Sequence, residues 1–442
     1  MQPVITNLLD EAFQVLQDND RSSYTQPAAD LYPHQWLWDS CFVAIGLVHK
    51  DPQRAMIEIK SLFKGQWANG MIPNIIFNND PAYRTDRNIW RSWTNPYAPD
   101  NIATTGITQP PLLAEAIYRI GEKLSWPERR TWYESVFPYL LKYHQWLYSE
   151  RDPHQEGLVL QIHPWEIGMD NTPPWMSELQ NHQLSWWIRL IKDAHLDYPI
   201  TKFRRDTKHI PARERFDTLE ALALYDIQRR LRRKAYNIQR ILDHSMFAIE
   251  DVGFNAILIR NNQLLENIAK SIKYTIPQPL LSSFKKTRQS FNQLWDDLNQ
   301  IYLSRDFITH RLLNESSIAG LLALYAGSIP LDHAKALLHH IQDKHSFGTN
   351  YPIPSVPINS YWYKPDRYWQ GPTWINTNWL IIDGLLRYGF IEQAKELRQS
   401  TLSMISNVGC YEYFNPDNGS GLGVVNFSWT AALAIDLILN PI

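Results

Sequence analysis

The chain has 442 residues, of which 44% are hydrophobic and 20% charged, as in ordinary globular proteins. Its 43 basic and 45 acidic side chains leave a net charge of −2, which argues against nucleic-acid or anionic-membrane partners. Cys41 and Cys410, the only cysteines, are too few for a disulfide framework or a cysteine zinc site. The N-terminal stretch lacks a signal-peptide pattern and no apolar run approaches ~20 residues, so we expect a cytoplasmic protein.

Helical periodicity extends over almost the whole chain. Leu113, Ile117 and Ile120, for example, recur at helical spacing after Pro110-Pro111, a pair suited to the start of a helix. The same pattern predicts an N-terminal helix and further helices at 39–49, 53–66, 126–149, 217–234, 236–272, 279–300, 315–325, 331–342, 372–388, 391–406 and 428–439. No segment shows convincing strand alternation, and no fixed-period repeat supports an open solenoid. The sequence predicts an all-α fold.

Aromatic and polar loops separate the predicted helices. They lie at 31–40, 65–74, 105–111, 163–175, 368–374 and 411–423. Each loop opens into a helix or lies just before one, so loops on the same rim of a closed double ring would converge on one cavity. This geometry is that of an (α/α)6 toroid, or six-hairpin barrel, and we expect residues 1–442 to form it as a single domain. Aromatic residues also fill large cores, but many here lie beside Gly, Pro, Asn and Asp, as in a sugar-stacking cavity.

The segment 176–235 differs from the rest because basic residues cluster in it, at 202–205 and 229–234. A basic run of this kind is most often a solvated helix face. The alternative is an inserted lid across the mouth of the cavity.

Three carboxylates lie among aromatic residues in these loops: Asp39, Asp170 and Glu412. Asp170 is central to the sequence WEIGMDNTPPW at 165–175, a shaped loop, although Asp170-Asn171 could also simply cap a turn. Paired carboxylates in an aromatic cavity suit glycoside hydrolysis, in which one acid protonates the leaving oxygen and one base activates water. No phosphate-binding, zinc-protease or serine-hydrolase motif occurs. We expect a small sugar as the ligand, and no metal or cofactor.

At this point the motifs resemble a known family. Residues 165–175 resemble the general-acid loop of glycoside hydrolase family 63 and its compact bacterial relatives, and 411–423 with 427–432 resemble the base loop and closing helix. The loops at 31–40, 68–74, 105–111 and 368–374 match that family in the same order, and 247–255 is similar to its connecting helix. The size and loops are most similar to members that hydrolyse α-glucosyl- or α-mannosyl-glycerate, which implies an inverting α-glycosidase for a small α-glucoside or α-mannoside.

The resemblance also implies roles for individual residues. It implies that Asp170 is the general acid and Glu412 the general base, with Asp39 and Gln109 bonded to the glycone. The remaining residues expected to bind substrate are Tyr32, Trp36, Trp38, Trp165, Gly168, Trp369, Trp374 and Trp429. Inversion requires about 6.5–9.5 Å between the two carboxyl groups. We expect Asp170 to be protonated in its poorly hydrated surroundings and Glu412 to be ionised.

Further residues are expected to support the site without contacting the sugar. Glu166 is expected to brace the acid loop. Asp251 and Asn255, one helical turn apart, are expected to form a buried structural pair.

The sequence departs from the family pattern at several positions. Gln370 stands where many members have an arginine, so a fixed cation is missing. Ile210 and Phe216 stand where glycerate-specific relatives are expected to use an Arg and a Tyr, although Arg205, Arg213 and Arg215 are nearby. These departures leave the acceptor undecided, and the sequence predicts neither the sugar epimer nor the oligomeric state.

Other functions fit parts of this pattern. A non-catalytic sugar-binding toroid would keep the tryptophans but could dispense with Asp170 or Glu412. A glycosidase for another small α-glucoside, trehalose-like or glucosylglycerol, would keep both carboxylates. A toroidal terpene cyclase needs acidic metal-binding clusters, and the sequence has none.

Overall fold

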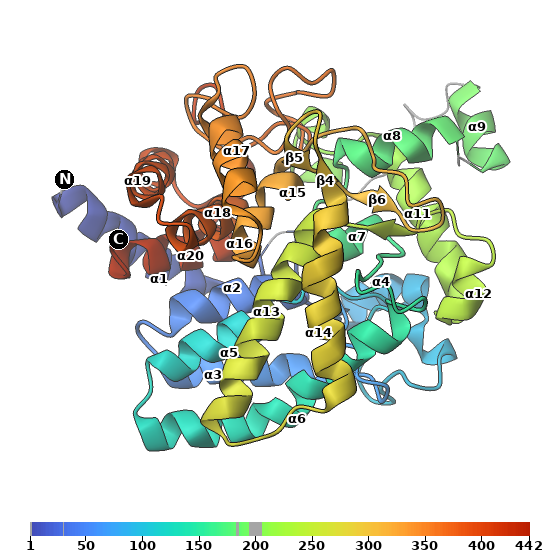
Figure 1. Ribbon diagram of the computed structural model, residues 1–442, viewed down its shortest axis with the longest axis horizontal. Helices are drawn as coiled ribbons and strands as arrows, with labels where there is room; N and C mark the ends of the chain where they lie inside the picture. The colour runs from blue at the N-terminus through green and yellow to red at the C-terminus, as the bar shows by residue number, and fades with distance from the viewer. Residues whose placement is uncertain (1, 30, 183–184, 194–205) are drawn as a thin grey trace.

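The computed structural model describes residues 2–29, 31–182, 185–193 and 206–442 (Figure 1). Within these residues, six inner helical positions form a ring in which each contacts the next and the last contacts the first. In chain order they are α2 (Leu37–Leu47), α5 (Leu113–Glu122), α13 (Val252–Ser271), the successive short helices α15 (Ile318–Leu321) and α16 (Ala323–Ala326), α18 (Ile375–Arg387) and α20 (Ser428–Leu439). The outer helices are α1 (Gln2–Asp18), α3 (Pro52–Lys64), α6 (Trp126–Glu150), α14 (Gln278–Ser290), α17 (Leu331–Gln342) and α19 (Ile391–Val408). The fold is the predicted (α/α)6 toroid.

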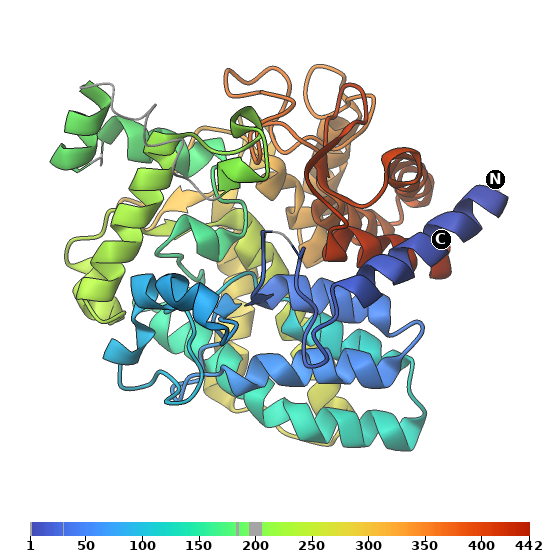
Figure 2. The same ribbon diagram turned by 180° about the vertical axis from the view of Figure 1, so that it is seen from behind.

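The contact between α2 and α20 closes the ring. Both helices are buried along almost their whole length, at residues 37–46 and 428–437, and their sequences are accordingly mostly apolar. Where they meet, a Cβ atom on Gly46 would lie 2.5 Å from the Cα atom of Ala432, a distance that only glycine allows. Helix α1 packs on α20, and the two chain termini lie near each other (Figure 2).

Two of the long predicted helices are interrupted. The prediction of one helix over 236–272 is wrong, because α12 (Ile238–Leu242) and α13 are separated by strand β3 (Ile249–Glu250). Asp251 sets the start of α13, since its side chain accepts a hydrogen bond from the Phe254 N–H at 2.7 Å. The helix predicted over 279–300 ends at Ser290, where η5 (Phe291–Leu294) and the pair β4 (Trp295–Asp296) and β5 (Ile301–Tyr302) follow.

Small antiparallel strand pairs also shape the loops. Strand β1 (Gln35–Trp36) pairs with β2 (Ile75–Ile76), and β3 pairs with β6 (Arg305–Asp306). The longest pair is β7 (Tyr411–Phe414) with β8 (Gly421–Val425), directly before α20. The loop after β2 contains η1 (Pro81–Tyr83), α4 (Arg84–Trp90) and η2 (Ser92–Thr94).

The longest connection joins outer helix α6 to inner helix α13. Its described elements are α7 (Pro164–Ile167), α8 (Pro173–His182), α9 (Trp186–Asp193), η3 (Asp206–Lys208), η4 (Ala212–Glu214), α11 (Thr218–Arg233) and α12. The basic residues 202–205, including Arg205, lie outside the described residues. On α11, Arg229 and Arg230 both pair with the buried Asp226. None of the helices in the described ranges is long and apolar enough to cross a membrane.

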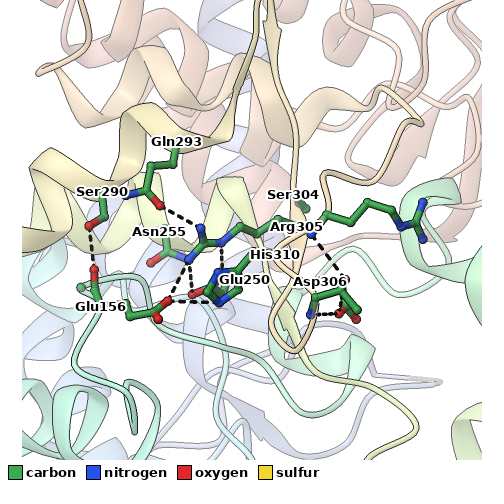
Figure 3. A network of polar contacts seen from close by, with 12 residues as sticks. Glu156, Glu250, Asn255, Ser290, Gln293, Ser304, Arg305, Asp306 and His310 are labelled. Carbon is green, nitrogen blue, oxygen red and sulfur yellow. Dashed lines mark hydrogen bonds and ion pairs between the residues drawn. The ribbon is translucent and has the colours of Figure 1, made fainter.

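A polar network around the buried pair Arg305 and Glu250 lies next to the start of α13 (Figure 3). The Arg305 guanidinium pairs with Glu250 and also donates to Gln293 Oε1 at 2.8 Å. The same β3 strand carries Ile249, which pairs with Gln161 just before the predicted acid loop. Burial raises the pKa of Glu250 to about 7 even though Arg305 opposes this rise.

Replacing Arg305 with methionine should leave the Glu250 carboxylate buried without a cation. We expect the free energy of unfolding to fall by about 3–5 kcal/mol at pH 8. The loss should be smaller at pH 5, because a carboxyl group whose pKa is raised by folding takes up a proton and destabilises the folded state less as the pH falls. Urea unfolding at both pH values measures this, and the Arg305→Met, Glu250→Gln double variant should remove the pH dependence. An equal loss at both pH values would contradict the prediction.

Candidate active site

Loops that lead from outer to inner helices meet at one end of the ring and enclose a cavity of about 180 Å³. Every residue predicted for the site lines this cavity except Trp374. The Trp374 ring lies behind Trp369 and is stacked on it, with 3.8 Å between the ring centroids. The cavity also contains residues that were not assigned to the site from the sequence: Pro27, Arg215, Phe216, Tyr368 and Phe427.

The position of Asp170 follows from the local sequence of its loop. Helix α7 is capped by the His163 ring, which accepts a hydrogen bond from the Trp165 N–H at 3.0 Å. The helix ends at Gly168, whose φ of 78° is left-handed, and a Cβ atom there would lie 2.7 Å from the Trp38 ring. Because α8 begins at Pro173, the residues between Gly168 and Pro173 form a tight turn, and Asp170 is within it.

Glu166 is fully buried and does not line the cavity. Its carboxylate accepts hydrogen bonds from Arg151 Nη2 at 2.7 Å and from the backbone N–H groups of Ile162 at 2.7 Å and Thr108 at 3.1 Å. The three donors come from three segments that precede the loop in the chain: the end of α6, the residue just before the loop, and the loop before α5. Glu166 therefore braces the loop, as the sequence predicted.

Glu412 enters the cavity from strand β7. Its Oε1 atom accepts a hydrogen bond from the Tyr32 hydroxyl at 2.9 Å and lies 3.4 Å from Arg215 Nη1. Its Oε2 atom accepts a hydrogen bond from the Val424 N–H on β8 at 3.3 Å. Hydrogen bonds to the ionised form stabilise a carboxylate, so Glu412 is held in a setting suited to a base.

Arg215 is the cation of the cavity, and its side chain is only 5% exposed. Its guanidinium lies 4.0 Å from the centre of the Tyr368 ring, and its Nε atom is 3.6 Å from Asp206 Oδ2. The Tyr368 hydroxyl in turn donates to Asp170 Oδ2 at 3.3 Å. Arg213, two residues earlier, is 75% exposed and lies 3.7 Å from Asp366, so only Arg215 of these two faces the cavity. Of the two positions where glycerate-specific relatives are expected to use an Arg and a Tyr, Phe216 lines the cavity and Ile210 is buried in the core.

Burial raises the pKa of all three carboxyl groups of the cavity, but the contacts that oppose this rise differ. It raises the pKa of Asp170 to about 7; Arg215 and Tyr368 oppose this rise, and the charge of Glu412 adds to it. Burial also raises the pKa of Glu412, against the stabilising contacts from Arg215 and Tyr32. The pKa of Asp39 is raised well above its ordinary value by burial, with further contributions from Glu412 and Asp170. Three carboxyl groups so close together cannot all be ionised without a large penalty.

The cavity also contains hydrogen-bond donors without partners in the described part of the chain. The indole N–H groups of Trp36 and Trp429 are buried and unpaired there. Buried donors are normally satisfied, so a ligand with hydroxyl groups would complete both. Gln109 Oε1 lies 3.4 Å from the backbone N of Trp38, which holds its amide at the wall.

A toroid with carboxyl groups and stacked tryptophans in one cavity is the architecture of a glycoside hydrolase. Comparison with known proteins identifies the family: the chain belongs to the mannosylglycerate hydrolase MGH1-like glycoside hydrolase domain family, whose sequence model matches residues 32–430. The protein is therefore a glycosidase.

Relatives of known function match over their full length. The chain is 35% identical to the mannosylglycerate hydrolase of Rubrobacter radiotolerans, covering 99% of this chain and 98% of that protein. It is 32% identical to the glucosylglycerate hydrolase of Mycolicibacterium hassiacum, covering 98% of this chain and 97% of that one. Among solved structures, the family 63 mannosylglycerate hydrolase of Thermus thermophilus in complex with Tris and D-glycerate superposes with a TM-score of 0.86 at 35% identity, covering 97% and 99% of the two chains.

The pKa of Asp170 can be tested without measuring any reaction. Asp170 should titrate near pH 7. In Glu412→Gln its pKa should fall, because a neighbouring negative charge is removed, and in Arg215→Met it should rise, because a positive charge is removed. Carbon NMR of labelled aspartate carboxyl groups, assigned with Asp170→Asn, measures all three values. Shifts in the opposite directions would contradict this account of the cavity.

Proposed function

We propose that the protein hydrolyses a small α-glucoside or α-mannoside of glycerate with inversion of configuration. Asp170 acts as the general acid and Glu412 as the general base. This assignment rests on the different contacts that the two carboxyl groups make within one cavity. Asp170 has a pKa of about 7 and accepts a hydrogen bond from Tyr368, whereas Glu412 is held by Tyr32, Arg215 and a backbone N–H. The relatives named above support the substrate class.

The reaction follows from these positions. Asp170, protonated near neutral pH, donates its proton to the glycosidic oxygen as the bond to the anomeric carbon breaks. Glu412 takes a proton from a water molecule that attacks the opposite face of the sugar ring. Asp39 and Gln109 bind glycone hydroxyl groups, and the rings of Trp36, Trp38, Trp165, Trp369 and Trp429 cover the apolar faces of the sugar, with Trp374 supporting Trp369 from behind.

Arg215 is proposed to bind the acceptor carboxylate. It lies at the wall shared by the catalytic cavity and a second cavity of about 300 Å³, and Tyr32, Trp36 and Trp165 form the rest of that wall. The segment 176–235, which carries Arg215, is accordingly proposed to act as a lid within a single catalytic domain. The carboxylate of a bound glycerate group would be a second carboxylate partner for Arg215, besides Glu412. We also propose that the protein is cytoplasmic, because glycosides of glycerate are compatible solutes and such solutes accumulate in the cytoplasm.

A glycosidase for a neutral glucoside is the second candidate, because Ile210 and Phe216 replace the expected glycerate-binding pair. Arg215 favours the anionic substrate over this candidate. A hydrolysis screen over glucosylglycerate, mannosylglycerate, glucosylglycerol and trehalose separates the two.

The first-formed sugar tests the mechanism. An inverting enzyme must release the β-sugar from an α-glycoside, because one displacement occurs at the anomeric carbon. Proton NMR of the product during the first minutes, before mutarotation, distinguishes the anomers. Release of the α-anomer would indicate a covalent intermediate and would overturn the roles given to Asp170 and Glu412.

The role of Arg215 can be tested against its neighbour. Arg215→Met should raise KM for glucosylglycerate by about tenfold or more, since a charge-assisted hydrogen bond contributes about 1.5–3 kcal/mol. The KM for glucosylglycerol should change much less, because that acceptor has no carboxylate. Arg213→Met, which removes an exposed cation two residues away, is the matched control and should leave both KM values unchanged. Equal changes for the two substrates in Arg215→Met would remove this residue from the acceptor site.

A further inference from the structure

Three consecutive residues before α18 hold the turn that carries Asp170. The Tyr368 hydroxyl donates to Asp170 Oδ2 at 3.3 Å, and the Trp369 backbone N–H donates to Asn171 Oδ1 at 3.0 Å. The Gln370 side chain donates from Nε2 to the Asn171 carbonyl oxygen at 2.9 Å. These hydrogen bonds hold the turn at the Asp170 carboxyl group, at the Asn171 side chain and at the Asn171 backbone carbonyl.

The same Gln370 amide reaches the inserted segment. Its Nε2 atom also donates to Glu220 Oε1 on helix α11, at 3.1 Å. Because Asn171 offers a carbonyl oxygen and Glu220 a carboxylate, both partners are acceptors, and only the NH2 group of the amide can serve both. Gln370 Oε1 has no partner within the described residues. The amide orientation is thus set by its two acceptors.

Glu220 is in turn fixed by a cation and by its own helix. Its Oε2 atom accepts a hydrogen bond from Arg367 Nη2 at 3.0 Å and from the Asp217 N–H at 2.8 Å, the second being part of the capping box that starts α11. Arg367 therefore supplies a cation close to the position where Gln370 replaces the arginine of the family. Glu220, Gln370 and Asn171 are all completely buried, and none of them lines the catalytic cavity.

We propose that Gln370 and Glu220 are positioning residues that connect the start of helix α11 to the general acid. In this arrangement, helix α11 holds Glu220 in place. Glu220 and Asn171 both accept hydrogen bonds from the Gln370 amide. The turn that contains Asn171 thereby keeps the Asp170 carboxyl group directed at the leaving oxygen. Proton transfer is sensitive to such placement, because displacements of about 0.5 Å already separate productive from unproductive geometry. The inference rests on the proposed role of Asp170 as the acid.

A purely structural role would make a different prediction. If Gln370 only stabilised the fold, its loss would affect every substrate to the same degree. If it positions the acid, its loss should affect only substrates whose leaving group needs a proton. A glycosyl fluoride needs none, because fluoride leaves as an anion, so it reports on the glycone site and the base alone.

The experiment compares glucosylglycerate with α-glucosyl fluoride in Gln370→Met, which keeps the length of the side chain and removes its donors. We expect kcat for glucosylglycerate to fall by about tenfold with little change in KM, and kcat for the fluoride to stay within about twofold. Gln370→Arg restores donors that can reach both acceptors and should recover most of the lost kcat. Arg233→Ala, an exposed residue at the other end of α11, is the control and should behave as wild type.

The contribution of the helix is tested with Glu220→Met and the double variant. Glu220→Met should show the same selective loss, and the double variant should be no worse than the more affected single variant, because both act through one amide. Equal losses on the two substrates, no loss in Gln370→Met, or additive losses in the double variant would each overturn the proposal. Fluoride turnover in each variant shows that it is folded.

Asp170→Asn is the reference variant, because it distinguishes a failure of the acid assignment from a failure of the positioning role. It should lose glucosylglycerate hydrolysis and retain fluoride turnover. If Asp170→Asn itself shows no such selectivity, the assignment of the acid fails. If it does and Gln370→Met does not, only the positioning role fails.

Discussion

The contact between α2 and α20 is the constraint on which the rest of the site depends. At this crossing the backbones approach so closely that Gly46 cannot carry a side chain opposite Ala432. The contact joins the first and last inner helices, and the loops that precede them are thereby brought together. As a result Tyr32 and Glu412, 380 positions apart in the chain, are 2.9 Å apart in the cavity. Without ring closure, Glu412 would lack the hydroxyl group that donates to its carboxylate.

The second constraint on the site is that the aromatic walls of the cavity exclude water from its carboxyl groups. Aromatic rings from helices α2 and α20 and from the loop before α18 pack against one another, with Trp38 next to both Trp369 and Trp429. In these surroundings a charge is costly unless it is paired, so the partners of each carboxyl group determine its protonation. Glu412 has a cation, a hydroxyl group and an N–H as partners, whereas the described contacts of the Asp170 carboxyl centre on Tyr368. This asymmetry supports the proposed roles of Asp170 as the acid and Glu412 as the base.

The long connection between α6 and α13 contributes more to the site than its position outside the ring suggests. It carries Asp170 and Arg215, and its helix α11 supplies Glu220 to the hydrogen-bond network behind Asp170. In the proposed mechanism, the connection between α6 and α13 therefore provides the acid and the cation, and the remaining loops provide the glycone side and the base. If these roles hold, changes in this connection would alter the choice of acceptor and leave the contacts with the glycone in place.

The sequence by itself determined the all-α class, most helix positions and the loops that form the site, because helical periodicity and short aromatic, Gly- and Pro-containing segments are local signals. Tertiary structure decided what depends on distant partners. The segment 236–272 breaks because β3 pairs with β6, some fifty residues further along the chain. Arg215 enters the cavity while Arg213 faces solvent, although both are arginines two residues apart. The pKa of Asp170 likewise depends on burial by side chains from remote loops, and no local pattern encodes that desolvation.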